Sequence, residues 1–271
     1  MGEYIYDAGW KRERERLRSL EATADPATLA AFAAVGVAPG WRCLEVGAGG
    51  GSVTAALAAL VDPGGTVVAV DLDTRFVEAL DAPNVEVHRL DITTDPVPGG
   101  PFDLVHARAV LEHLPSRDEV LARLAALLRP GGWLVVEDVD FLLPVNADPA
   151  AVAAPTPEVA RRLAAMWRAN ATFMATSGVD PEYGRWLPFR LADLGLEGVG
   201  ASAAAQVLTP TAPSFAAARW SLEHLRGPLV QQGLLRDEEV DALLDDLRRP
   251  VSGWGPLFVT AWGRKPPVAA A

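Results

Sequence analysis

The segment LEVGAGGGS, residues 44–52, joins an apolar run to a cluster of glycines. The apolar run begins at Trp41, and a second apolar run, residues 67–70, ends in Asp71. Glycines let the backbone turn tightly, and a helix that starts there presents free N–H groups to a ligand. The order strand, glycine turn, helix, strand and acid is typical of the nucleotide-binding half of an open α/β sheet.

The acidic residues around the glycines indicate which nucleotide binds. In a dinucleotide fold the glycines follow G-x-G-x-x-G/A, and counting from Gly47 the sixth position is Ser52, which matches only roughly. Glu45 lies two residues before the first glycine, where a carboxylate would repel a pyrophosphate but suits a cationic group. Asp71, twenty-four residues beyond Gly47, lies where an acid can accept hydrogen bonds from ribose hydroxyls. S-adenosylmethionine has a ribose, a sulfonium and an ammonium but no phosphate, and it fits this pattern.

Several segments together resemble the class I S-adenosylmethionine-dependent methyltransferases, in particular bacterial small-molecule methyltransferases. They follow the family's order, span about the first half of the chain and include the typical LRPGGWLVVED; they are residues 44–51, 67–73, 90–92, 102–114 and 128–138. The resemblance implies an α/β, Rossmann-like fold with a mostly parallel seven-stranded sheet and helices on both faces. It also implies N-terminal helices and a helical lid after the fifth strand.

The resemblance assigns roles to residues at the ends of the predicted strands. Glu45 would hold the methionine ammonium, and Asp71 would bind the ribose. Asp91 would accept a hydrogen bond from the adenine amine. Arg108 would meet the cofactor's carboxylate or an anionic substrate, or it forms a surface ion pair. The remaining expected cofactor contacts are the backbone of Gly47, Ala48 and Gly49, the side chain of Leu72 and the backbone N–H of Ile92.

A catalytic base is expected among the four histidines. Methyl transfer from a sulfonium is an in-line displacement in which the enzyme mainly positions the acceptor, but an oxygen acceptor often has to lose a proton. His113 and His224 lie in predicted helices near the expected acceptor site, so either can serve as this base. We interpret His88 and His106, which lie in predicted strands, as structural.

The pair Glu112-His113 also resembles a segment of ubiquinone-type O-methyltransferases that bind a divalent metal. That metal site needs an earlier glutamate, and the corresponding position here is Ala109. We therefore predict no metal.

Aromatic residues outside the predicted sheet favour a fairly large apolar or aromatic acceptor. At helical spacing such residues can equally be core; the candidates are Tyr6, Trp10, Trp167, Phe173, Trp186 and Trp220. The leading hypothesis is O-methylation of a small-molecule secondary metabolite. The alternatives are C- or N-methylation, a methyltransferase-like protein that binds the cofactor and catalyses a cyclisation or rearrangement, and a nicotinamide-dependent oxidoreductase.

Composition narrows the range of partners. The 271 residues are half hydrophobic and carry a net charge of −11, which argues against nucleic acid and anionic membranes as partners. No run of 18 apolar residues and no signal-like N-terminus is present, so we expect a cytoplasmic protein that acts on a small molecule as a monomer or homodimer.

Four segments are expected along the chain. They are an N-terminal helical cap (1–36), a cofactor-binding core (37–141), a helical lid (142–194) and the C-terminal part of the sheet (195–271). Within them, Asp25-Pro26 predicts the start of a helix over 26–35, and Ser116 with Glu119 predicts a capping box. The fifth strand is expected over 133–139.

Overall fold

The computed structural model describes residues 12–142, 154–249 and 253–268. Their contacts form two compact units. The core unit comprises residues 25–138, 183–202 and 259–271, and the helical unit comprises residues 1–24, 139–182 and 203–258. The division into four segments expected from the sequence stays a prediction.

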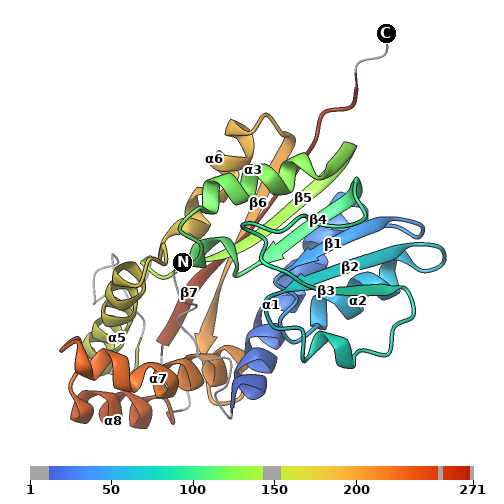
Figure 1. Cartoon of the computed structure of the whole chain (residues 1–271). Coiled ribbons are helices and arrows are strands. Elements are labelled where there is room, and N and C mark those ends of the chain that lie inside the picture. Colours follow the sequence, from blue (N-terminus) through green and yellow to red (C-terminus); the bar gives the residue numbers. More distant parts are fainter. Residues whose placement is uncertain (1–11, 143–153, 250–252, 269–271) are drawn as a thin grey trace. The chain divides into compact units, whose positions relative to one another are not determined.

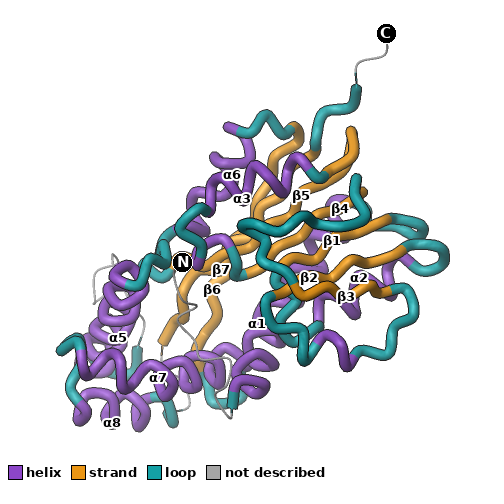
Figure 2. The backbone as a smooth tube through the Cα atoms, in the orientation of Figure 1, coloured by secondary structure: helices purple, strands orange, loops and turns teal. Residues whose placement is uncertain are grey.

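Seven strands form one sheet in the order β3-β2-β1-β4-β5-β7-β6 (Figures 1 and 2). The strands are β1 (Arg42–Val46), β2 (Thr66–Asp71), β3 (Val85–Arg89), β4 (Phe102–Arg108), β5 (Leu128–Asp140), β6 (Glu197–Leu208) and β7 (Gly253–Arg264). β1 pairs in parallel with both β2 and β4, and the pairs β2–β3 and β4–β5 are also parallel. The chain order therefore reverses direction between β1 and β4, the point at which open α/β sheets bind ligands beyond the carboxyl ends of their strands.

Helices cover both faces of the sheet in the core unit. Side chains alternate between the faces along each strand, so both faces carry apolar side chains against which helices pack. On one face, Cys43 and Leu104 pack with Phe32 of α1 (Glu13–Val35) and Leu57 of α2 (Ser52–Val61). On the other face, Leu44 and its neighbours pack with α3 (Arg117–Ala126) and α6 (Tyr183–Asp193). The predicted Rossmann-like architecture is confirmed.

The helical unit has its own apolar core. It is built from α5 (Pro157–Thr176), α7 (Pro213–Gln231) and α8 (Asp237–Asp246), which pack through Leu163, Leu225 and Leu243 among others. The Thr156 hydroxyl caps α5 by accepting a hydrogen bond of 3.2 Å from the backbone N–H of Val159, as Thr156-Pro157 indicates. Throughout the described chain, no helix is long and apolar enough to cross a membrane.

Three local predictions were wrong. Helix α1 does not begin at Pro26 but runs without interruption from Glu13, and Pro26 lies inside it. The Asp25 carboxylate accepts hydrogen bonds from Arg108 and Ser52 instead of capping a helix. Ser116 makes no side-chain cap for α3, and β5 begins at Leu128, where it already pairs with Phe102 of β4.

Candidate cofactor and catalytic site

The glycine loop between β1 and α2 depends on left-handed backbone conformations. Gly47, Gly49 and Gly51 have φ angles of 72°, 51° and 91°. The backbone N–H of Gly47 donates a hydrogen bond of 2.8 Å to the carbonyl of Val70, which fixes the loop to the end of β2. A Cβ atom at Gly47 would lie 2.3 Å from Cγ2 of Val110, so only glycine fits both the angle and the space.

Asp71, the last residue of β2, holds the glycine loop from the other side. Its Oδ2 accepts a hydrogen bond of 2.8 Å from the backbone N–H of Gly49, and its Oδ1 accepts one of 3.0 Å from that of Asp73. Burial raises the pKa of Asp71, although both hydrogen bonds act in the opposite direction. The next side chain, Leu72, is 59% exposed, so an acid and an apolar surface lie in sequence at this edge of the sheet.

Asp91 follows the end of β3 and is held by its own turn. The backbone N–H and the hydroxyl of Thr93 donate to Asp91 Oδ1 at 2.8 and 2.6 Å. Within the described chain no residue donates to Oδ2. The Ile92 side chain is buried, and its carbonyl accepts a hydrogen bond from Arg123.

Glu45, next to last in β1, belongs to a buried cluster of charges. Only 2% of its side chain is exposed, and its Oε2 lies 2.7 Å from Nδ1 of His106 on β4. The other ring nitrogen, Nε2, lies 3.8 Å from Oε2 of Glu137 on β5. Glu137 also accepts hydrogen bonds from the hydroxyls of Thr28 and Thr260.

The cluster favours a charged imidazole. Burial disfavours the imidazolium, but Glu45 and Glu137 outweigh burial and raise the pKa of His106 to about 9. Burial raises the pKa of Glu45 even though His106 opposes that shift. For Glu137, the contacts with His106, Arg108 and Thr28 outweigh burial and lower the pKa. A histidine that is positive at neutral pH therefore lies between two carboxylates.

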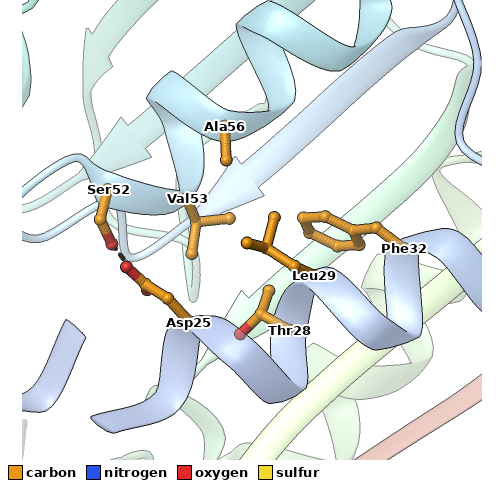
Figure 3. Close-up of a pocket in the computed structure, with 7 residues that line it drawn as sticks. All are labelled: Asp25, Thr28, Leu29, Phe32, Ser52, Val53 and Ala56. Carbon is orange, nitrogen blue, oxygen red and sulfur yellow. Dashed lines mark hydrogen bonds between the residues drawn. The ribbon is translucent and has the colours of Figure 1, made fainter. Parts of the chain in front are cut away.

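Arg108, at the end of β4, contacts helix α1. Its guanidinium donates to Asp25 Oδ1 at 2.8 Å, to the Thr28 hydroxyl at 2.9 Å and to the Ser52 hydroxyl at 3.3 Å. Residues of α1 and α2, among them Asp25, Thr28 and Ser52, line a pocket of about 30 Å³, and Figure 3 shows the hydrogen bond between Asp25 and Ser52. This volume has room for one or two water molecules but not for a nucleoside. The expected contact of Arg108 with the cofactor's carboxylate stays a prediction.

The two candidate bases lie in different units. His113 ends the 3₁₀ helix Leu111–His113 of the core unit, with its Nε2 3.3 Å from Glu112 Oε1. The backbone N–H of Glu112 donates to Oδ1 of Asp138, and burial, assisted by Glu112, raises the pKa of Asp138 well above its ordinary value. His224 lies on α7 of the helical unit, one turn after Trp220.

The predicted acceptor-site aromatics are also divided between the units. In the helical unit, Trp167 and Phe173 lie in the apolar core, and Trp220 lies under the guanidinium groups of Arg12 and Arg219. Trp186, in the core unit, is 46% exposed. Tyr6 and Trp10 lie outside the described residues.

Comparisons with known proteins find similarity in the segment that holds the loop and the strand-end acids. Residues 44–134 match the model of a methyltransferase domain. Methyltransferase str3 of Strobilurus tenacellus is 42% identical over 102 residues, which are 37% of this chain and 36% of the relative. The ubiquinone biosynthesis O-methyltransferase of Burkholderia orbicola is 32% identical over 102 residues, which are 35% of this chain and 43% of the relative. The chain thus spans less than half the length of these relatives.

A solved structure extends the similarity to the fold of most of the chain. Phosphoethanolamine N-methyltransferase 2 of Haemonchus contortus, in complex with phosphomonomethylethanolamine and S-adenosylhomocysteine, aligns with a TM-score of 0.55 at 16% identity. The alignment covers 93% of this chain and 57% of that one. The matched segment holds the glycine loop, Asp71 and Asp91, so this chain contains a methyltransferase domain, and its fold is that of S-adenosylmethionine-dependent methyltransferases.

Proposed function

We propose that this protein transfers a methyl group from S-adenosylmethionine to a small-molecule acceptor, with O-methylation of a secondary metabolite as the leading reaction. The observation that carries this proposal is the row of acids at the carboxyl ends of three adjacent parallel strands. Glu45 lies at the end of β1, Asp71 ends β2, and Asp91 follows β3. Similarity to a ubiquinone biosynthesis O-methyltransferase supports oxygen as the acceptor atom.

The chemistry of this edge fits a cationic, phosphate-free nucleoside. Glu45 and Asp91 each keep one carboxylate oxygen to which no described residue donates, and these oxygens suit an ammonium and an adenine amine. Asp71 has further lone pairs for ribose hydroxyls, and the exposed Leu72 offers an apolar surface for a base.

S-adenosylmethionine supplies an activated methyl group when it is bound, so the protein has little bond-making chemistry to add. The strand-end acids bind and orient the cofactor, and the residues around the acceptor exclude water. For an oxygen acceptor, His113 or His224 removes the proton of the hydroxyl.

The test begins with binding and proceeds to transfer. We expect isothermal titration to show binding of S-adenosylmethionine and S-adenosylhomocysteine but not of NAD⁺. Incubation with methyl-labelled S-adenosylmethionine and a panel of phenols, carboxylic acids and amines should then label an oxygen acceptor. Tight binding of NAD⁺ alone would exclude the cofactor assignment.

The same assay separates the alternatives. Label on nitrogen or carbon would indicate N- or C-methylation. A product of unchanged mass that also forms with S-adenosylhomocysteine would indicate a cyclisation or rearrangement. We propose further that the protein is cytoplasmic, acts as a monomer or homodimer without nucleic acid, membrane or metal, and takes its acceptor beside the aromatic residues named above.

A further inference from the structure

The charged cluster around His106 is built on one face of the sheet. Glu45 of β1 and His106 of β4 are partners in the parallel register, so their side chains point to the same face. Farther toward the amino ends of the strands this face is apolar, with Cys43, Leu104 and Val135 packed against α1 and α2. The charges therefore gather only at the carboxyl end, directly below the glycine loop, and methyl transfer itself requires none of them except Glu45.

The two carboxylates beside His106 differ in how many of their oxygens accept hydrogen bonds from the protein. Glu137 Oε1 accepts from Thr260 at 3.0 Å, and Glu137 Oε2 accepts from Thr28 at 2.7 Å and faces His106. Glu45 accepts only at Oε2, from His106, and no other described residue donates to its Oε1. Both oxygens of Glu137 thus have partners in the protein, while Oε1 of Glu45 can accept a hydrogen bond from a ligand.

We propose that His106 is a positioning residue for cofactor binding, which holds Oε2 of Glu45 so that Oε1 is presented to the ammonium group of S-adenosylmethionine. This inference rests on the proposed function. His106 does not reach the ligand itself, because its ring is fully buried. The edge of the ring is fixed by Phe32 of α1, whose centroid lies 5.2 Å away in a T-shaped contact.

The charges around His106 include one negative charge that no cation of the cluster compensates. Glu45 faces the ring from β1 and Glu137 from β5, while Arg108 on its own strand is paired with Asp25 of α1. The imidazolium compensates one of the two glutamates, and Arg108 and Asp25 compensate each other. One negative charge therefore remains next to the glycine loop, and a ligand ammonium balances it.

Titration with two ligands tests the proposal. S-adenosylhomocysteine carries the ammonium, whereas 5′-methylthioadenosine has the same nucleoside without it. The variant His106→Leu has no donor for Oε2 of Glu45, whereas His106→Asn keeps an N–H donor near the position of Nδ1. We expect His106→Leu to weaken S-adenosylhomocysteine binding at least tenfold at pH 7.5 and to change the affinity for 5′-methylthioadenosine by less than twofold, and His106→Asn to recover most of the lost affinity. The matched control His88→Asn, on β3, should change neither affinity by more than twofold.

The outcomes separate this inference from the proposed function. An equal loss of both ligands in His106→Leu would show a purely structural role and overturn the proposal, as would unchanged binding of S-adenosylhomocysteine in that variant. If the wild-type protein binds neither ligand, the proposed function itself fails.

A measurement on the wild-type protein keeps the proposal testable if His106→Leu does not fold. With ¹⁵N-labelled histidine, one of the four rings should remain an imidazolium at pH 8. Its resonances should shift when S-adenosylhomocysteine is added but not when 5′-methylthioadenosine is added. The absence of such a ring would overturn the proposal.

Discussion

The backbone N–H of Gly49 donates a hydrogen bond of 2.8 Å to Oδ2 of Asp71, so the glycine loop is held by the carboxylate that we expect to bind the ribose. One side chain thereby links the end of β2 to the loop that precedes α2. The shape of the loop and the affinity for the nucleoside consequently depend on the same group.

Asp71→Asn should therefore weaken both the fold and cofactor binding. The amide has one acceptor oxygen in place of two, so it cannot accept from both Gly49 and Asp73 in the present geometry, and one partly buried N–H loses its partner. We expect a loss of about 1–3 kcal/mol in the free energy of unfolding and an affinity for S-adenosylhomocysteine that is about tenfold to a hundredfold lower. Urea denaturation and calorimetric titration measure the two effects. The exposed Asp81→Asn serves as control, and an Asp71→Asn protein that binds as tightly as wild type would contradict the assignment.

Gly47→Ala tests whether the loop depends on space as well as on backbone conformation. The new Cβ would lie 2.3 Å from Val110 Cγ2 at a φ angle of 72°. Gly64 is a matched control, because it has a φ angle of 84° and nothing within 4 Å of the new atom. Gly64→Ala should cost about 1–2 kcal/mol of stability from conformation alone, and Gly47→Ala should cost about 1–3 kcal/mol more from overpacking.

The double variant Gly47→Ala/Val110→Ala separates the two contributions in the same denaturation experiment. It should recover the overpacking part of the loss but not the conformational part. Equal losses for Gly47→Ala and Gly64→Ala would show that the contact with Val110 does not constrain the loop.

Much of the candidate cofactor site could be predicted from the sequence because its signals are local. The glycines lie between two apolar runs. Glu45, Asp71 and Asp91 each lie at the end of a predicted strand, and each of these strands can be recognised from its own segment of the sequence. A parallel sheet then brings these ends to one edge whatever the details of packing.

The buried cluster around His106 could not be predicted from any one segment. His106 in an apolar strand resembles an ordinary core residue, and its contacts with Glu45 and Glu137 require β1, β4 and β5 to be neighbours in a known register. The alternation of side chains along each strand was the available signal, since it places all three residues at the carboxyl end of one face once the strand order is known. The predicted acceptor site has no comparable signal, because the sequence after Phe141 holds no motif with a fixed spacing.

Thr28→Val tests whether helix α1 supports the charged cluster. The Thr28 hydroxyl donates to Glu137 at 2.7 Å and accepts from Arg108 at 2.9 Å, so valine removes two charge-assisted hydrogen bonds without changing the shape. We expect a loss of about 1.5–3 kcal/mol in the free energy of unfolding.

Two further variants serve as controls for Thr28→Val. Thr28→Ser should restore most of the lost stability. Thr172→Val, which removes a hydrogen bond to the Arg168 carbonyl within helix α5, should cost far less. Equal losses at both threonines would contradict a supporting role for α1.

Asp138 predicts a specific dependence of stability on pH. Its pKa in the folded protein lies well above that in the unfolded chain, so the folded state binds this proton more tightly. The free energy of unfolding should therefore fall as pH rises from the ordinary aspartate pKa of about 4 through the raised value, by at most about 1.4 kcal/mol per pH unit. Asp138→Asn, which resembles the protonated acid, should lack this contribution.

The difference between wild type and Asp138→Asn isolates the contribution of this group from those of Glu45 and His106. Urea unfolding at pH 5, 6, 7 and 8 should show that the free energy of unfolding of the variant rises relative to that of the wild type until the pH passes the raised pKa of Asp138. The exposed Glu119→Gln on α3 should follow the wild type. A parallel course for Asp138→Asn would mean that Asp138 is ionised in the folded protein.

His113 and His224 give opposing predictions for the base, because they lie in different units and either can remove the acceptor's proton. If His113 is the base, His113→Ala should lower kcat for the labelled acceptor by about 10²- to 10⁴-fold. The dissociation constant of S-adenosylmethionine should change by less than twofold, since no cofactor contact is assigned to this ring.

The comparison with His224 decides between the two candidates. If His113 is the base, His224→Ala should lower kcat far less, and the reverse order would assign the base to α7. The contact of His113 Nε2 with Glu112 Oε1 at 3.3 Å is consistent with the first outcome, because a carboxylate at this distance orients the ring. Unchanged turnover in both variants would show that the enzyme acts by positioning its acceptor alone, as an already activated methyl group permits.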